Sequence, residues 1–531
     1  MLLRAFATVG SLTAVSRVLG FIRDILMAAA LGTGPVADAF FVAFRFPNLF
    51  RRLFAEGAFN AAFVPLFATR LERDGKAAAK AFAEQALAAL TAAVLLLTAL
   101  CLLAMPWLMQ VIAPGFTDDP EQFALAVELT RIAFPYLLAM ALVALLSGVL
   151  NALYRYAAAA AAPILLNLFF IAAIILVLPH FRDAPGQVLA WTVCLAGLGQ
   201  LLLLLWAAKR AGMALRMPRP RLTLEIRRLW RLMLPGVASA GAMQFNLLVG
   251  TMIATLQAGA VSYLYYADRL YQLPLGIIGI GIGVVLLPEL ARKLRAGRDD
   301  EAHSSLNRAL EFSLLLTLPA TAALLVAPFP IISVLFERGA FDAEAARLTA
   351  WALAAFAIGL PAYVLVKVLQ PPFFAREDTV TPLRFALASV AANLILSLLL
   401  FFTIGFVGIA LATALSSWLN VLLLAGRLRR RGFLHFDARL RRRLPRSLAA
   451  ALAMALALIL LQPLLADLFA GGEIERILAL ALLVMAGGGL YFLLAFALRA
   501  VEPADFRAAF RRKTTSGDGD QSRNENRPRK A

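Results

Sequence analysis

ALAALTAAVLLLTALCLLAM, residues 86–105, runs for twenty positions without a charged side chain. An α-helix rises 1.5 Å per residue, so about 20 apolar residues cross the hydrocarbon core of a bilayer. The stretch does not alternate between apolar and polar positions, as a strand of a membrane β-barrel would. It therefore predicts a transmembrane helix.

Similar apolar segments recur along the whole chain. Of its 531 residues, 62% are hydrophobic and 16% charged, whereas soluble domains have about 45–50% and about 25%. This composition excludes a soluble enzyme. We expect an all-α polytopic membrane protein with about fourteen helices, at residues 5–31, 36–69, 81–112, 122–152, 158–179, 187–208, 230–255, 260–290, 308–327, 347–370, 381–402, 405–426, 446–466 and 475–498.

The distribution of basic residues predicts the orientation of these helices. Nearly all Lys and Arg residues outside the predicted spans fall in one set of alternate connections, together with the C-terminal tail. The other set holds only Arg182, Arg338, Arg347 and Arg476. Basic loops remain in the cytoplasm. We therefore expect both termini there, and the net charge of +19 is no sign of nucleic-acid binding.

The sequence also repeats internally. A shift of 220 residues aligns Ala190–Gly212 with Ala410–Gly432, and Leu31–Leu71 aligns with Leu256–Leu294. In both cases a helix matches the sixth one after it, which predicts two parallel six-helix lobes, an arrangement known in transporters. The expected domains are an N-terminal lobe, a C-terminal lobe, a helix pair and a basic, disordered cytoplasmic tail, at residues 1–229, 230–445, 446–498 and 499–531.

The cysteines and histidines do not form the patterns of a disulfide, metal-binding or catalytic site. Cys101 and Cys194 lie in separate apolar runs, and His180, His303 and His435 fall in separate predicted loops. No disulfide framework, metal-ligand spacing or catalytic histidine is evident. We expect no enzyme, no metal site and no catalytic residue.

Arginines inside the predicted spans are the strongest functional signal. Arg17, Arg23, Arg51, Arg52 and Arg269 lie within or beside apolar runs. A charge at the centre of a bilayer costs at least about 2.5–3.5 kcal/mol, so such residues usually face a wet cavity. A guanidinium group offers a planar fork of donors suited to phosphate. The pattern predicts an interior site for an anionic, phosphorylated substrate.

In the first helix, SRVLGFIRD at residues 16–24 places Arg17 and Asp24 seven residues apart, on one face. Arg23 points about 120° away from Arg17. We expect Arg17 to line a cavity, Arg23 to border it and Asp24 to supply the counter-charge, next to Ser16. Arg23 and Asp24 could instead mark the headgroup boundary.

The second predicted helix carries a long polar stripe, formed by Asp38, Arg45, Asn48, Arg51, Arg52 and Glu56. Pro47 interrupts it, and proline kinks a helix. Helix geometry therefore leaves open whether Arg51 or Arg52 faces inward. Arg52 and Glu56 are also spaced as a structural i,i+4 ion pair.

The eighth predicted helix carries Asp268 and Arg269. We expect Asp268 to neutralise Arg269 when no substrate is bound. We expect Lys367, in a later span, to extend to a membrane interface rather than to bind ligand.

At these residues the chain resembles the MurJ (MviN) family of bacterial lipid II flippases, within the multidrug/oligosaccharidyl-lipid/polysaccharide exporter superfamily. The resemblance extends through all the predicted helices. Its matching stretches are SRVLGFIRD at 16–24, ADAFFVAFRFPNLFRRLFAEGAFNAAFVP at 37–65, YYADRLYQLPLGIIGIGIGVVLLP at 265–288, LFERGAFD at 335–342 and PFFAREDTVTP at 372–382.

The resemblance implies a substrate and a site. Lipid II is undecaprenyl diphosphate bearing a disaccharide-pentapeptide, and the family moves it across the bacterial inner membrane for peptidoglycan synthesis. The family's cationic cavity implies that Arg17, Arg23, Arg51 and Arg269 bind substrate with Asp38 nearby, which favours Arg51 over Arg52. Residues 446–498 would hold the lipid tail. The implied partners are lipid II, membrane lipids and, transiently, cell-wall synthesis proteins. No cofactor is implied, and a coupling ion or the membrane potential stays open as the energy source.

Four alternatives remain. An exporter of another anionic lipid-linked glycan would suit the same arginines. A drug/cation antiporter of the same superfamily would require carboxylates to dominate the cavity. A polyprenyl-diphosphate phosphatase lacks an evident nucleophile. A scaffold for cell-wall enzymes would leave the arginines unexplained.

Overall fold

The computed structural model describes residues 2–51 and 59–502. Over these residues the chain is helical, and the one β pairing is an isolated bridge between Arg338 and Phe341. The longer helices are α1 (Leu2–Leu31), α2 (Pro35–Arg51), α3 (Phe59–Arg73), α4 (Gly75–Leu103), α6 (Pro120–Ala133), α7 (Tyr136–Ala152), α8 (Ala157–Ala172), α9 (Pro185–Arg210), α10 (Leu224–Ala254), α11 (Ala260–Arg295), α12 (Asp299–Val326), α14 (Ala343–Leu369), α16 (Val380–Ile404), α17 (Phe406–Arg430), α18 (Ala438–Leu464) and α20 (Glu473–Ala497). The shorter ones are α5 (Met105–Ile112), α13 (Pro328–Phe336), α15 (Pro371–Phe374) and α19 (Ala466–Ala470).

Ten stretches of the described residues are long and apolar enough to cross a membrane, which confirms a polytopic membrane protein. They contain α4, α6 with α7, α8, α9, α12, α14 with α15, α16, α17, α18 and α20. The other four predicted spans correspond to α1, α2 with α3, α10 and α11. Three of these four carry arginines of the predicted site.

Several predicted helices are interrupted. The span predicted at 122–152 divides into α6 and α7 at Pro135, because proline lacks the amide that a continuous helix needs. The span predicted at 81–112 divides into α4 and α5 at Ala104, just before Pro106. His303 lies within α12 rather than in a loop, and its ring packs 5.7 Å from that of His435.

Helices α9 and α17, which the sequence repeat aligns, end in the same way. Gly212 and Gly432 have φ values of +71° and +72°. In each case the next amide bonds back into the last turn: Met213 N donates to Ala208 O at 2.9 Å, and Phe433 N donates to Leu428 O at 2.8 Å. Glycine takes this left-handed conformation without the strain of a Cβ atom. The 220-residue repeat thus extends to the local geometry of the helix ends.

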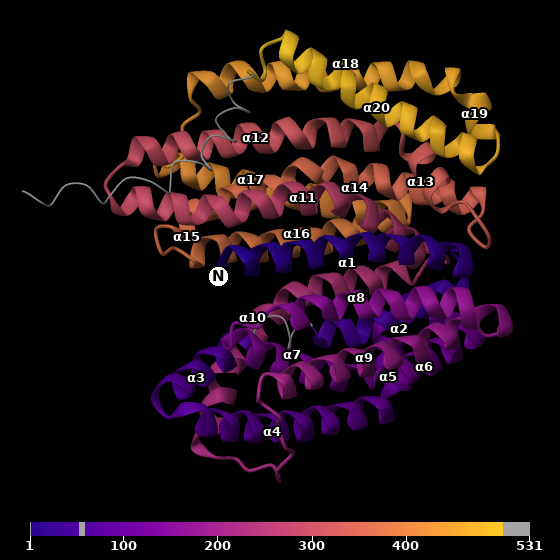
Figure 1. The fold of residues 1–531 in the computed structure, drawn as a ribbon. Coiled ribbons are helices and arrows are strands. Elements are labelled where there is room, and N and C mark those ends of the chain that lie inside the picture. The colour runs from indigo at the N-terminus through magenta and orange to yellow at the C-terminus, as the bar shows by residue number, and fades with distance from the viewer. Residues whose placement is uncertain (1, 52–58, 503–531) are drawn as a thin grey trace, which may run out of the picture.

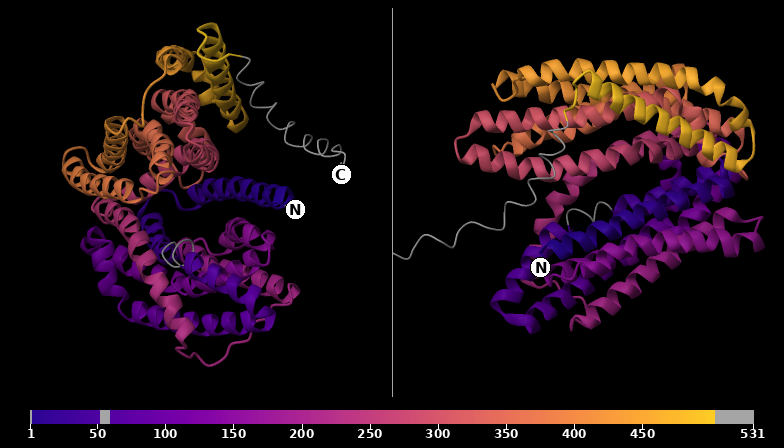
Figure 2. Two further views of the ribbon diagram at one scale, coloured as in Figure 1. Left: turned by 90° about the vertical axis from the view of Figure 1, so that its left-hand side faces the viewer. Right: turned by 45° about the horizontal axis from the view of Figure 1, so that its top comes forward.

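The long helices run side by side in two groups (Figure 1). Helices α2–α9 form one group and α11–α20 the other, with α1 along the boundary between them (Figure 2). The pair α18 and α20 packs on α12 through its own apolar cluster, which includes Met454, Leu458, Leu483 and Leu315. The hydroxyl of the buried Tyr491 donates to Leu315 O at 2.7 Å. Most of the predicted tail lies outside the described residues.

Candidate functional site

A cavity of about 680 Å³ lies where α1 of one group meets α11 and α14 of the other. Four cationic side chains line it, Arg17 and Arg23 from α1, Arg269 from α11 and Lys367 from α14. Asp24 is the one carboxylate among its lining residues. The cavity therefore carries an excess of positive charge, as the arginine pattern predicted.

Asp24 is the centre of an ion-pair cluster. It is buried, and Arg23 donates to its Oδ1 from Nη2 at 2.7 Å and from Nε at 3.1 Å. Tyr265 OH donates to the same oxygen at 3.3 Å. Nε of Arg269 lies 3.8 Å from Oδ2. One carboxylate thus serves two arginines from two helices, which holds α1 and α11 together across the boundary.

Arg23 is fixed by α8 as well as by Asp24. Its Nη1 donates to Oδ1 of Asn167 at 3.0 Å, and its guanidinium lies 5.6 Å from the ring centroid of Phe170. Asn167 in turn donates to Ser16 O at 2.8 Å. Asn167 is a positioning residue that the sequence interpretation missed. Its signal was an amide inside an apolar helix, where a polar side chain usually needs a partner.

Arg269 is held more loosely than Arg23. Its guanidinium lies 4.6 Å from the ring centroid of Tyr265, a cation–π contact. Its side chain is 32% exposed, and its Nε has no hydrogen-bond partner among the described residues. The predicted neighbour Asp268 instead accepts a hydrogen bond from Gln272, one turn along the same helix. Asp24, not Asp268, is the carboxylate within ion-pair distance of Arg269.

Arg17 extends from α1 across to α11. A Cβ atom built on Gly276 would overlap Nη1 of Arg17, so the guanidinium lies directly on the surface of that glycine. Arg17 is exposed and forms no ion pair within residues 2–51 and 59–502. It is a cation at the cavity surface with no ion-pair partner in the described part of the chain.

Lys367 also faces this cavity. Its side chain is exposed near the end of α14, so the expectation that it extends to a membrane interface stays a prediction. Its position in an apolar run gave the same signal as the arginines. The sequence interpretation did not place it at the cavity, because lysine near a helix end often extends to a membrane interface.

Arg45 and Asn48 of α2 are not among the residues that line the cavity. Arg45 donates to Oγ1 of Thr251 on α10 at 2.7 Å, and Asn48 donates to Phe44 O within α2 at 2.9 Å. Arg51 is the last described residue of α2, and its side chain is not described. Arg52 and Glu56 lie outside the described residues, so the choice between Arg51 and Arg52 stays a prediction.

Asp38 joins the two groups at one end. This fully buried carboxylate accepts hydrogen bonds from Gly259 N at 2.7 Å, Ser262 N at 2.9 Å and Ser262 Oγ at 2.5 Å. These donors belong to the start of α11, so Asp38 satisfies amides that a helix leaves unpaired. The structure places Asp38 as a cap between the groups rather than on the cavity lining.

Backbone contacts close the same end. Ala340 N donates to Ala29 O at 2.8 Å, and Tyr266 OH donates to Gly32 O at 3.3 Å. Gly32 and Gly339 have φ values of +62° and +59°. A Cβ atom on either glycine would overlap the backbone of the opposite group. Close approach of the two groups therefore depends on glycine at both positions.

Gly339→Ala should loosen this closed end. Alanine in a left-handed conformation costs about 1–2 kcal/mol, and its methyl group would also press on Ala29. We expect hydrogen–deuterium exchange at residues 337–342 to become about tenfold faster, the factor that about 1.4 kcal/mol produces. Gly34→Ala is the matched control, because nothing lies within 4 Å of a Cβ atom there. Equal exchange in the two variants would contradict the assignment.

The sequence model of the family described as "Lipid II flippase MurJ" matches residues 27–495. The chain belongs to the MurJ family. A probable lipid II flippase MurJ of Rhizobium tropici is 46% identical over 517 residues, covering 96% of this chain and 97% of that protein. The corresponding Rhizobium meliloti protein is 52% identical over 434 residues, covering 81% of each chain. The lipid II flippase MurJ of Burkholderia cenocepacia is 37% identical over 442 residues, covering 81% of this chain and 84% of that protein.

Solved structures agree on the fold. A lipid II flippase MurJ in an inward closed conformation aligns with a TM-score of 0.75 at 23% identity, covering 94% of this chain and 99% of that one. An inward-facing multidrug resistance MATE family transporter of the MOP superfamily aligns with a TM-score of 0.66 at 15% identity, covering 78% and 95%. Membership of the MurJ family confirms a multi-pass membrane transporter of the flippase class rather than an enzyme.

Proposed function

We propose that this MurJ-family chain moves lipid II from the inner to the outer leaflet of the bacterial cytoplasmic membrane by alternating access. The observation that carries the proposal is the cavity between the two helix groups, where four cations face one carboxylate. In lipid II a diphosphate joins the disaccharide-pentapeptide to the polyprenyl chain. Such a group needs several cationic donors once it leaves water.

The cationic side chains of the cavity differ in how firmly protein partners hold them, and we assign them different roles on that basis. Arg23 is committed to Asp24 and Asn167, so it mainly sets the local potential. Arg17 is exposed, and the Arg269 side chain is 32% exposed and lies at 3.8 Å from its partner Asp24, so we propose that these two contact the diphosphate directly. Guanidinium groups bind phosphate oxygens in pairs, which fixes orientation as well as charge. We propose Arg51 as a further contact on the family pattern alone.

Gly276→Ala should weaken substrate binding several-fold without unfolding the protein. The new methyl group would occupy the place of the Arg17 guanidinium and turn it away from the cavity. Alanine is otherwise the better helix former, by about 1 kcal/mol. Gly279→Ala, three residues along α11, is the matched control, because its Cβ atom would meet Leu275 and Lys367 at ordinary contact distances of 3.6 and 3.8 Å. Titration of lipid II onto the purified variants measures the difference, and identical affinities would exclude a role for Arg17 at this surface.

We propose fourteen spans, arranged as an N-terminal lobe (1–229), a C-terminal lobe (230–445) and a final helix pair (446–498), with both termini in the cytoplasm. The matching ends of α9 and α17 support the two-lobe repeat. The contacts around Asp38 and Gly339 then form an outer gate, closed in this conformation. Rocking of the lobes would break them and open the cavity outward.

The polyprenyl tail would remain in lipid along α18 and α20, whose outer faces expose leucine and isoleucine side chains such as Leu452, Leu456, Ile459 and Leu482. The inside-negative membrane potential would favour outward movement of the anionic head. Each charge gains about 2.3 kcal/mol per 100 mV.

Functional replacement tests this proposal. The wild-type chain is expressed in bacteria whose own essential lipid II flippase can be depleted, with membrane insertion checked in parallel. Continued growth after depletion supports lipid II transport. Lysis despite good insertion would remove lipid II as the substrate and favour another anionic lipid-linked glycan, which would suit the same cations. A drug/cation antiporter is disfavoured, since the cavity would repel a cationic substrate.

A further inference from the structure

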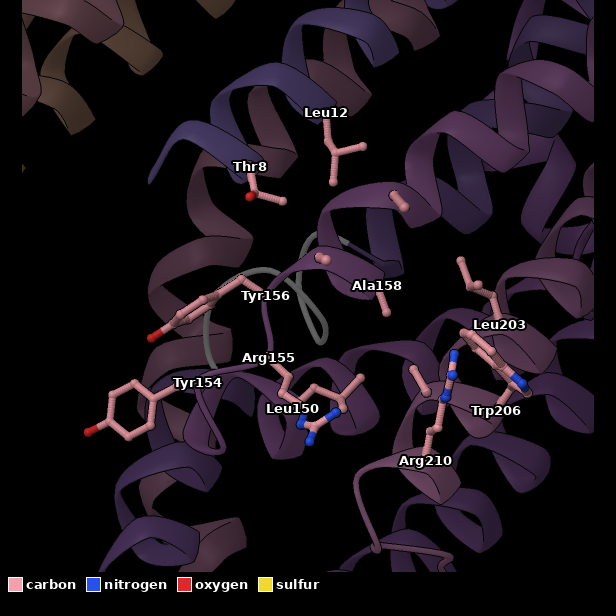
Figure 3. Close-up of a pocket in the computed structure, with 13 residues that line it drawn as sticks. Thr8, Leu12, Leu150, Tyr154, Arg155, Tyr156, Ala158, Leu203, Trp206 and Arg210 are labelled. Carbon is pink, nitrogen blue, oxygen red and sulfur yellow. The ribbon is translucent and has the colours of Figure 1, made fainter. Parts of the chain in front are cut away.

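A second and larger pocket lies within the N-terminal group, with a volume of about 840 Å³ (Figure 3). Thr8 and Leu12 of α1, the first turns of α8 and the last turns of α7 and α9 surround it. Its walls are apolar and are formed by leucine and alanine side chains, namely Leu12, Leu150, Leu203, Ala157, Ala158, Ala161 and Ala207. A free inorganic ion would gain nothing from such walls, whereas a hydrocarbon chain would be stabilised by them.

The rim of the pocket is cationic and aromatic. Arg155 and Arg210 both line it, and neither forms an ion pair with a carboxylate in the part of the chain that the structure describes. The Arg210 guanidinium lies 5.1 Å from the ring centroid of Trp206, and the two side chains lie together in Figure 3. Trp and Tyr residues gather at the headgroup level of membranes. This rim therefore has the composition of a binding site for a lipid headgroup.

The backbone at this rim holds an uncommon conformation. Tyr154 has a φ value of +59°, in the left-handed region where helix ends usually carry glycine. The α7 end is otherwise a regular helix stop, with Arg155 N donating to Leu150 O at 2.8 Å. A tyrosine at this position presents an aromatic side chain that is 73% exposed. The first turn of α8 begins next to it, and no side chain caps that turn.

This pocket is separate from the cavity between the two groups. The two share no lining residue. On α1, Thr8 and Arg17 are nine residues apart, which is two and a half turns, so they point to opposite sides of the helix. A molecule in this pocket therefore lies on the other side of α1 from Arg17.

We propose that this pocket binds one anionic phospholipid, with its phosphate held by Arg155 and Arg210 and an acyl chain along the leucine and alanine walls. The volume suits a headgroup with part of a chain, since ligand pockets generally span about 300–1,000 Å³. The pocket lies at the end of the helices where the basic connections gather. Anionic lipids of the cytoplasmic leaflet are attracted to such surfaces. A bound lipid here would support α1, whose opposite face carries Arg17, so lipid composition would affect the cavity between the groups.

Native mass spectrometry of the purified full-length protein tests the proposal, with phosphatidylglycerol and phosphatidylethanolamine as probes. We expect one phosphatidylglycerol molecule to be retained in preference to phosphatidylethanolamine. Arg155→Gln with Arg210→Gln should weaken that retention by about tenfold or more. Arg228→Gln with Arg384→Gln is the control, because it removes the same charge from two exposed arginines outside the pocket. Ala158→Phe fills the wall without changing charge and should also reduce retention.

The outcomes separate the alternatives. Equal retention of both lipids by the wild type, or equal loss in the pocket and control variants, would overturn the proposal. Displacement of the lipid by millimolar inorganic phosphate would identify a simple anion site instead. Displacement by lipid II at equal concentration would make the pocket part of the substrate path, and the phospholipid assignment would fall. Failure of functional replacement would not affect these results, since they measure phospholipid binding alone.

Discussion

We expect Arg269→Ala to abolish lipid II transport in protein that is inserted and folded. Its side chain lines the cavity and is 32% exposed, so part of the guanidinium is accessible to the diphosphate. Hydrogen bonds to charged groups contribute about 1.5–3 kcal/mol each, which corresponds to a loss of about 10- to 100-fold in affinity. The fold should tolerate the change, because Asp24 retains Arg23 at 2.7 Å as its partner. This makes Arg269 a cleaner test than Arg23, whose removal would also free Asn167 and Asp24.

Binding of lipid II and growth after flippase depletion would be measured side by side for this variant. Arg384→Ala is the control, since Arg384 is an exposed arginine outside the cavity lining. Growth and affinity at wild-type levels in Arg269→Ala would mean that Arg269 only holds α11 against α1. Loss of both in Arg384→Ala would point to a general effect of charge.

We expect Asp24→Asn to destabilise the protein by about 3–5 kcal/mol, the range found when one partner of a buried ion pair is removed. The reason is geometric: the carboxylate is 3% exposed and serves both Arg23 and Arg269. Without it two cations face each other across α1 and α11 with no counter-charge. Thermal unfolding in detergent measures the loss.

A double variant identifies the cause. Adding Arg269→Gln to Asp24→Asn removes the repulsion and should recover about 1–3 kcal/mol, the size of coupling seen between contacting residues. Asp467→Asn is the matched control, because that carboxylate is exposed and has no partner among the described residues. Unfolding of Asp24→Asn at the wild-type temperature would show that the cluster contributes no net stability.

Sequence patterns predicted the class of fold and the cationic character of the site. A helix needs about 20 apolar residues to cross a bilayer, and every charge inside the bilayer is costly. Membrane spans and the arginines within them are therefore easy to recognise in the sequence. The 220-residue repeat also aligned Gly212 with Gly432, and the structure shows that these glycines end α9 and α17 in the same way. Each of these features can be recognised within one segment of the sequence, without knowing how the helices pack.

Pairings between distant segments were harder to predict. Sequence proximity suggested Asp268 for Arg269, but the relative rotation of α1 and α11 gives that role to Asp24. Asn167 lies more than a hundred residues from Arg23, and no local pattern connects the two. Lys367 was expected at a membrane interface because lysine near a helix end often reaches one, and its place on the cavity lining was not predicted. Asp38 belonged to the polar stripe of α2, yet its partners are the first amides of α11.

Flipping of fluorescent lipid II in proteoliposomes tests the central claim most directly, because it reports on substrate and cavity in one measurement. The comparison uses wild type, Arg269→Ala and Arg384→Ala at equal reconstitution. We predict translocation by wild type and Arg384→Ala, and none above empty liposomes by Arg269→Ala. Translocation by Arg269→Ala at the wild-type rate would contradict the account.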